Sequence, residues 1–221
     1  MASGIFDVIG PVMIGPSSSH TAGAARIGLA VNKMLHGNVL EAEITLYNSF
    51  AETGKGHGTD MALIGGLLGY DADNKRLPHS FEDAEAKGLK YSFKEKSNTT
   101  YHPNTAKIKA KNETMSIEVR ASSIGGGTIE IDTVNRFDVN VTCQLDTIIF
   151  SHRDRPGVLK EITAAMGELD INIAAMHVSR VRKGGEAVTV IEVDTVVTEE
   201  IKKEIQELSI VDEFLFIPKI S

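Results

Sequence analysis

Hydroxyl and imidazole side chains gather in the stretch GPSSSHT at residues 15–21. Small and apolar residues follow at helical spacing and predict a helix over residues 19–35. The first N–H groups of a helix lack intrahelical partners and carry a partial positive charge, so they can hold an anion. The stretch therefore predicts either a pocket for a carboxylate or phosphate or an ordinary cap, which would need only one serine. The side chains concerned belong to Ser17, Ser18, Ser19, His20 and Thr21.

A second histidine is surrounded by alternating glycines in TGKGHGTD, residues 53–60. Because glycine adopts dihedral angles that other residues avoid, we expect a tight loop that holds His57 close to a ligand, before a helix over residues 57–68. Lys55 is not followed by serine or threonine, and the glycine spacing is GxGxG. The stretch is therefore neither a P-loop nor a dinucleotide-binding motif. With Lys55 and Asp60 close by, the pattern favours a functional histidine over a structural one.

Two further stretches combine the same residue types. HPNTAK begins at His102 and predicts a turn that enters a strand, with Asn104 as a polar neighbour. SSIGGGT at residues 122–128 predicts either a backbone nest for an anion or a glycine-rich hairpin. His20, His57 and His102 form one site only if the fold brings them together, which their spacing alone does not decide.

The composition excludes several classes of protein. Of the 221 residues, 42% are hydrophobic and 24% are charged, and the net charge of −7 argues against a nucleic-acid-binding surface. No apolar run approaches the roughly 20 residues that span a bilayer, and the first residues lack a signal-peptide pattern. A cytoplasmic protein that binds neither nucleic acid nor membrane is expected. The single cysteine, Cys143, is interpreted as a buried thiol in a strand, and this chain alone cannot build a multi-cysteine metal site.

The elements that must position these residues fall into two domains. Residues 1–145 are expected to form an α+β domain, in which the two helices come first and antiparallel strands come last. A strand is predicted over residues 41–49, and a polar, lysine-rich interval covers residues 71–96. The later strands are expected over residues 105–111, 114–122, 128–135 and 137–145.

Residues 146–221 show a shorter and clearer pattern. Strands alternate with two helical segments in the order β-α-β-β-α-β, which is the ferredoxin-like arrangement. The first helix follows Pro156, and Thr198 is the expected cap of the second. These residues are predicted to form a separate small domain.

Four motifs taken together resemble one known family. GPSSSHTAGAARIG, TGKGHGTD, HPNTAKI and SSIGGGTIEI are similar to the β subunit of the iron-sulfur-dependent L-serine dehydratases. The segments SHRDRPGVLKEI and DINIAAMHVSR look like an ACT domain, a ligand-sensing module of amino-acid metabolism. The resemblance covers essentially the whole chain. It implies that L-serine loses water to give an aminoacrylate, which becomes pyruvate and ammonia.

The resemblance also implies a 4Fe-4S cluster that acts as a Lewis acid on the departing hydroxyl group. Cysteine thiolates hold such clusters, and one cysteine cannot supply them. A separate α subunit is therefore the expected partner and the expected owner of the cluster. Monovalent cations such as potassium activate members of the family, but no site for one can be located in the sequence.

Roles for individual residues follow from the same resemblance. His57 is the expected base for the Cα proton of serine, since neutral imidazole is available near physiological pH. His102, with Asn104, is expected to orient the substrate or to handle the proton of the leaving group. The residues expected to bind the substrate's carboxylate and amino groups are Ser17, Ser18, Ser19, His20, Thr21 and Lys55.

The resemblance leaves an alternative of another class. A similar domain serves in some phosphoglycerate dehydrogenases as an allosteric substrate-binding module, so a non-catalytic, serine-sensing regulator is the second interpretation. ACT domains bind amino acids at a dimer interface, which implies dimerisation and makes L-serine the expected effector. The same residues would also fit an ordinary helix start and turn. The candidate effector residues are His152, Asp154, Gly157, Asn172 and Ile173.

Overall fold

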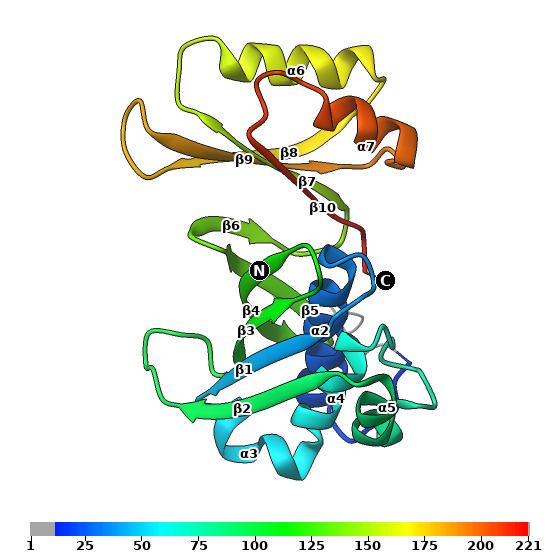
Figure 1. The fold of residues 1–221 in the computed structure, drawn as a ribbon. Helices are drawn as coiled ribbons and strands as arrows, with labels where there is room; N and C mark the ends of the chain where they lie inside the picture. The colour runs from blue at the N-terminus through cyan, green and yellow to red at the C-terminus, as the bar shows by residue number, and fades with distance from the viewer. Residues whose placement is uncertain (1–11, 221) are drawn as a thin grey trace. The chain divides into compact units, whose positions relative to one another are not determined.

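The computed structural model describes residues 12–220 (Figure 1). The chain divides into two compact units, one that ends at Asn135 and one that begins at Arg136. The boundary at residues 145 and 146 expected from the sequence lies later in the chain and stays a prediction, and β6 (Phe137–Val141), which lies between the two positions, is part of the same sheet as the strands of the first unit.

The first unit combines helices with a mixed sheet (Figure 1). Its helical segments are η1 (Ser18–Ala22), α2 (Gly23–Met34), α3 (Ser49–His57), α4 (Thr59–Leu67), η2 (Leu77–His79) and α5 (Ser80–Lys87). Its strands are β1 (Glu41–Tyr47), β2 (Lys90–Lys96), β3 (Thr105–Lys111), β4 (Ser116–Gly125) and β5 (Thr128–Val134). The α+β class predicted from the sequence is confirmed.

Within residues 12–220 the sheet has six strands in the order β2-β1-β3-β4-β5-β6, and its last strand, β6 (Phe137–Val141), follows directly after Asn135. β1 and β2 are parallel, while β1–β3, β3–β4 and β4–β5 are antiparallel. Parallel neighbours need a crossover connection, and the chain makes it through α3, α4, η2 and α5. The lysine-rich interval at residues 71–96 therefore holds more structure than its polar composition indicated.

Helices α2 and α4 pack against each other at a glycine pair. A Cβ on Gly66 of α4 would overlap the carbonyl oxygen of Ala25 on α2, and a Cβ on Gly28 would overlap that of Leu63. Only glycine lets the two backbones approach this closely. The pair fixes how α4, and with it the end of α3, lies against α2.

The glycine-rich motif is the clearest correction to the sequence interpretation. Residues 53–57 are not a loop, because they form the last turns of α3, which ends at His57. Gly58 then takes a left-handed conformation, with φ of 67°, and joins α3 directly to α4. The second helix consequently begins at Thr59 instead of residue 57.

The second unit has the predicted β-α-β-β-α-β order after an additional strand. It contains β6 (Phe137–Val141), β7 (Asp146–Arg153), α6 (Val158–Glu168), β8 (Ile173–Arg180), β9 (Glu186–Val193), α7 (Glu199–Gln206) and β10 (Glu213–Ile217). The sheet order is β10-β7-β9-β8, and α6 and α7 lie on one of its faces (Figure 1). The Thr198 side chain accepts a hydrogen bond from the Ile201 N–H, as expected of a cap.

Cys143 is buried, but it lies beyond the end of β6 instead of within a strand. Its φ is 57°, and its carbonyl oxygen accepts a hydrogen bond from Ile220 N at 2.9 Å. Within residues 12–220, no helix is both long enough and apolar enough to cross a membrane.

Candidate active site

The first turn of the helical stretch that begins at Ser18 is wider than an α-helical turn. The Ala22 N–H donates to the Ser17 carbonyl and the Gly23 N–H to the Ser18 carbonyl, which are i to i+5 hydrogen bonds. Such π-type turns occur frequently at functional sites. The Ser17 hydroxyl accepts from His20 N at 3.1 Å and so serves as the cap, while Ser18 and Ser19 are half-buried in the turn. One serine therefore caps the helix and the other two remain candidates for a ligand.

His57 ends α3 in a defined orientation. Its Nδ1 lies 3.0 Å from the carbonyl oxygen of Thr53, one helical turn earlier. A carbonyl oxygen can only accept, so Nδ1 carries the hydrogen and the neutral ring keeps its lone pair on Nε2. The buried Thr21 hydroxyl donates to the His57 carbonyl at 2.9 Å and fixes the end of α3 against η1. His57 is thus a positioned histidine with a basic nitrogen available.

His20 lies beside His57, with 4.9 Å between the ring centroids. Its Nε2 is 3.1 Å from the hydroxyl oxygens of both Ser49 and Thr53. The Thr53 hydroxyl already donates its hydrogen to the Ser49 carbonyl, so its contact with His20 requires a hydrogen on Nε2. His20 therefore takes the opposite tautomer, with its lone pair on Nδ1.

The surroundings of His20 favour its neutral form. Its pKa is lowered from the ordinary value of 6.5, first by burial and then by the neighbouring His57, while the contact with Ser49 acts in the opposite direction. The edge of the Phe50 ring packs against the imidazole with a centroid distance of 5.4 Å. A neutral His20 does not repel a proton that His57 accepts.

The turn at residues 102–105 joins this region through backbone contacts. The Pro103 carbonyl accepts from Phe50 N at 3.3 Å, which ties the turn to the start of α3. The exposed His102 accepts from Asn104 N at 3.1 Å through Nδ1, so its own hydrogen bond stays within the turn. The structure thus brings His20 and His57 into contact. It also places the turn that contains His102 against the start of α3, the helix that carries Ser49 and Thr53.

The motif SSIGGGT packs against the start of α2. The Ser123 N–H donates to the Asn104 carbonyl at 2.9 Å, and the buried Ser123 hydroxyl fills the space that a side chain on Gly23 would need. The following glycines all have positive φ and form the β4–β5 hairpin, so the hairpin alternative is the one observed. The Arg26 guanidinium donates to the Gly127 carbonyl at 2.9 Å and holds this hairpin on α2.

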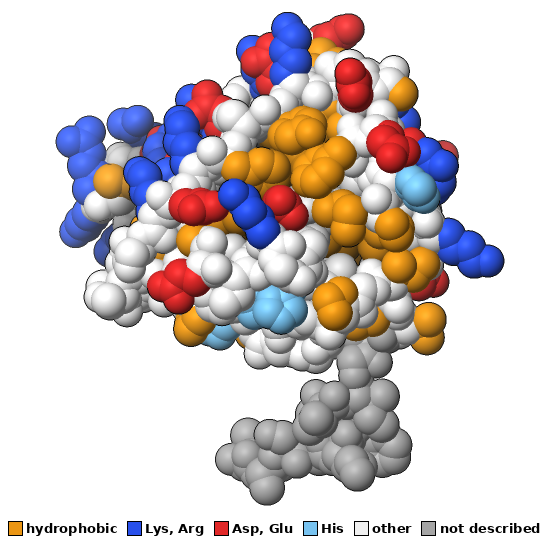
Figure 2. Space-filling model, turned by 90° about the horizontal axis from the view of Figure 1, so that it is seen from below, with side chains coloured by type: hydrophobic (Ala, Val, Ile, Leu, Met, Phe, Trp, Pro, Cys, Tyr) orange, Lys and Arg blue, Asp and Glu red, His pale blue; other side chains and the backbone are white. Residues whose placement is uncertain are grey.

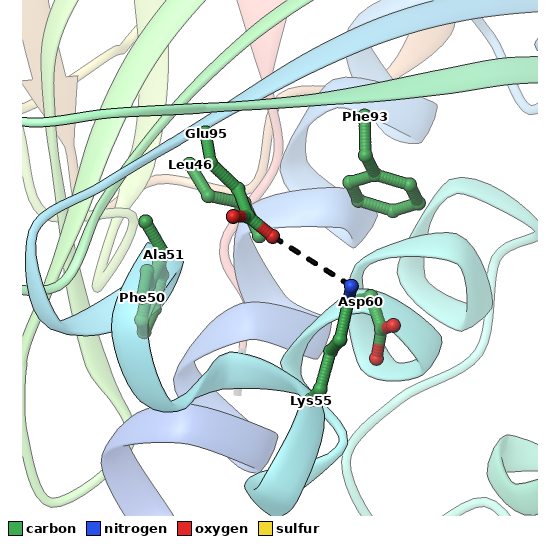
Figure 3. A pocket seen from close by; sticks show the side chains of 7 residues that line it. All are labelled: Leu46, Phe50, Ala51, Lys55, Asp60, Phe93 and Glu95. Carbon is green, nitrogen blue, oxygen red and sulfur yellow. Dashed lines mark ion pairs between the residues drawn. The ribbon is translucent and has the colours of Figure 1, made fainter.

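Lys55 lies on a different side of α3 from His57, since two residues along a helix turn through about 200°. Its amine is 3.9 Å from the Glu95 carboxylate of β2 and is largely exposed. Figure 3 shows Lys55 with Glu95 and Asp60 around a separate cavity. Its predicted role in substrate binding stays a prediction, and it is set apart from the histidine pair.

Comparisons with known proteins identify the family. The model of the serine dehydratase beta chain family matches residues 4–133, and the ACT domain model matches residues 147–209. The chain is 42% identical to the probable L-serine dehydratase beta chain of Bacillus subtilis over 92% of this chain and 93% of that protein. It is 36% identical to the L-serine dehydratase beta chain of Peptoniphilus asaccharolyticus over 90% of this chain and 91% of that protein. The chain belongs to the serine dehydratase beta chain family.

A more distant relative has a different activity in its name. The D-3-phosphoglycerate dehydrogenase of Bacillus subtilis is 26% identical over 82% of this chain, and the match covers 35% of that longer enzyme. A stretch similar to most of this chain therefore also occurs within a longer protein.

The ACT domain of this beta chain separates its five candidate effector residues. Asp154 pairs with Arg180 and Gly184 N, each at 2.9 Å, and Gly157 precedes α6 with φ of 91°. Asn172 pairs with Asp194 at the start of β8, next to Ile173. His152 is buried, with Nε2 2.8 Å from the Thr189 hydroxyl and Nδ1 3.1 Å from the Arg153 carbonyl.

The strand register places these residues at opposite ends of the sheet. Arg153 pairs with Glu186 at the start of β9, whereas Ile173 pairs with Val193 at its end. One ACT domain therefore cannot bring Asp154 and Asn172 to the same ligand.

Three residues that the sequence interpretation passed over complete the candidate site. Ser49 and Thr53 hold His20, and Phe50 packs against it. Ser49 and Thr53 are four residues apart, so they share one face of a helix. That spacing was a readable signal, but the expectation of a glycine loop over residues 53–60 concealed it.

Proposed function

We propose that this chain is the β subunit of an L-serine dehydratase and that it contributes His57 as the base of an active site shared with an α subunit. The observation that carries the proposal is the orientation of His57, whose Nδ1 donates to the Thr53 carbonyl and leaves Nε2 as the proton acceptor. A base held by a second group in this way is the arrangement that general base catalysis uses.

The chemistry assigned to these residues is a proton abstraction followed by loss of the hydroxyl group. His57 Nε2 takes the Cα proton of L-serine, and the β-hydroxyl leaves with a proton as water. The resulting 2-aminoacrylate tautomerises to an imine, which water hydrolyses to pyruvate and ammonia. His102 and Asn104 are the candidates that orient the substrate or handle the proton of the leaving group. When His57 takes the proton it becomes positively charged, and a neutral His20 beside it avoids repulsion between two charged rings.

The substrate carboxylate is assigned to the helix start at Ser18 and Ser19. The Ser17 hydroxyl already caps this turn, and the Thr21 hydroxyl donates a hydrogen bond to the His57 carbonyl. The hydroxyl groups of Ser18 and Ser19 therefore remain for a ligand. The partial positive charge of the helix N-terminus supports an anion at this place. Such a carboxylate would lie on the same turn as His20.

The 4Fe-4S cluster does not fit the residues of this chain. Cys143 is its single cysteine, and burial, with a smaller contribution from Glu192, raises the pKa of its thiol to about 12. No three His, Cys, Asp or Glu side chains within residues 12–220 converge as a metal site. We therefore assign the cluster to the α subunit, and the names of two relatives as L-serine dehydratase beta chains support such a partner.

Reconstitution tests the assignment directly. The chain is purified alone and together with an anaerobically prepared, cluster-bearing α chain, and pyruvate formation from L-serine is measured for each sample. Turnover only when both chains are present is the expected result. An α chain that turns over L-serine equally well without this chain would contradict the shared active site.

A serine-sensing regulator is the second candidate, and the similarity to phosphoglycerate dehydrogenases favours it. The same experiment separates the two functions. Binding of L-serine by this chain, without turnover in any reconstituted complex, would favour the regulator. The intact histidine pair favours the catalytic function, because a module that only binds a ligand does not need an oriented base.

The ACT domain is assigned to dimerisation and effector binding, with L-serine as the proposed effector. β8 is an edge strand whose residues are mostly exposed, among them Met176 at 43% and Val178 at 40%. An antiparallel, twofold pairing of two β8 strands would place the start of one strand beside the end of the other. It would bring Asn172 of one copy toward Asp154 of the second, which one domain alone keeps apart.

A further inference from the structure

A cavity of about 360 Å³ lies on the side of α3 that faces away from the histidine pair (Figure 3). Leu46 of β1, Phe50 and Ala51 of α3 and Phe93 of β2 give it apolar walls. Figure 2 shows hydrophobic side chains gathered beside charged ones on the face where α3 and α5 lie in Figure 1. The cavity itself is lined by both apolar and charged side chains.

Charged groups from three elements meet at the cavity. The amine of Lys55 on α3 is 3.9 Å from the carboxylate of Glu95 on β2, a long contact between two exposed side chains that contributes little by itself. Asp60 on α4 accepts a hydrogen bond from the N–H of the next residue at 2.8 Å. Two carboxylates and one ammonium group therefore line the cavity, and their formal charges sum to −1.

The size and the chemistry of the cavity select a class of ligand. Small-molecule sites have volumes of about 300–1,000 Å³, so this cavity of about 360 Å³ is at the lower limit and suits a ligand as small as an amino acid. We propose that it binds a free amino acid with an apolar side chain. Lys55 binds the carboxylate, Asp60 and Glu95 bind the ammonium group, and the side chain packs against Leu46, Ala51 and Phe93.

One side chain connects this cavity to the candidate active site. Phe50 forms part of the cavity wall, and its ring edge contacts His20 at a centroid distance of 5.4 Å. A ligand that presses on this wall changes the packing around His20. The proposal goes beyond the dehydratase function and stands or falls without it, because both the binding and its effect on His20 are measured on this chain alone.

The test uses L-leucine as the probe and NMR of the full-length chain as the readout. We expect chemical-shift changes at the amides of Lys55, Phe93 and Glu95 and at the His20 ring. Two further probes dissect the recognition: 3-methylbutan-1-amine lacks the carboxylate, and 4-methylpentanoate lacks the ammonium group. Each is expected to bind at least about tenfold more weakly than L-leucine.

Two substitutions of the same kind provide the control. Glu95→Gln removes a charge from the cavity and is expected to weaken L-leucine binding about tenfold. Glu43→Gln removes a similarly exposed carboxylate, which pairs with Lys94 at 3.3 Å on the same two strands, and is expected to leave binding unchanged. No shifts at the cavity residues at millimolar L-leucine would overturn the proposal. So would binding that Glu95→Gln does not change, or an amine that binds as tightly as the amino acid.

Discussion

His20 and His57 hold their hydrogens on opposite nitrogens, and this follows from their partners. The Thr53 carbonyl fixes the hydrogen of His57 on Nδ1, while the Thr53 hydroxyl requires a hydrogen on Nε2 of His20. Thr53 therefore sets the tautomers of both rings. The sequence pointed to both histidines, but it could not show that one threonine joins them.

The pKa of His20 gives the first prediction at this scale. Burial and His57 lower it, so NMR titration of the folded chain should give a midpoint below 6.5. His57→Gln should raise that midpoint, but burial is the larger cause and keeps it below 6.5. His79→Gln, an exposed histidine in η2, is the control. A His20 midpoint at or above 6.5 would contradict the burial described here.

The same shift sets a direction for stability. The folded state favours neutral His20, so its contribution to the free energy of unfolding is complete above pH 6.5. The contribution is lost as the pH falls from 6.5 through the lowered pKa of the folded state, because the unfolded chain binds the proton more readily.

Among the elements, α3 shows what the sequence could and could not decide. The ferredoxin-like order of the second unit was readable because its strands and helices alternate in short, regular segments. Three glycines in TGKGHGTD indicated a loop, yet tertiary packing keeps residues 49–57 helical and only Gly58 uses its conformational freedom. The parallel pairing of β2 with β1 was equally hidden, since β2 is a polar edge strand with almost no buried residues.

Two glycine substitutions test this account of the helices. Gly66→Ala should lower the free energy of unfolding by about 1–3 kcal/mol or more, because the new Cβ overlaps the backbone of α2. Gly56→Ala lies in α3 with open space around it and should raise that free energy by about 0.5–1 kcal/mol. Urea unfolding measures both. A destabilising Gly56→Ala would restore the glycine-loop interpretation.

At the scale of the whole molecule, the proposed ACT dimer gives the next prediction. Val178→Lys places a charge on the exposed edge strand β8 and should convert a dimer into a monomer in analytical ultracentrifugation. Val196→Lys is the matched control, because Val196 is 77% exposed and lies outside the strands. A dimer that withstands Val178→Lys would rule out pairing through β8.

The central claim is that His57 of this chain is the base of a shared active site. Its most direct test is the kcat for pyruvate formation from L-serine by the complex of His57→Gln with the cluster-bearing α chain, measured beside the wild type and His79→Gln. We predict that kcat for His57→Gln falls by about 10²–10⁴-fold while L-serine still binds, and that His79→Gln matches the wild type. A His57→Gln complex that keeps the wild-type kcat would contradict the account.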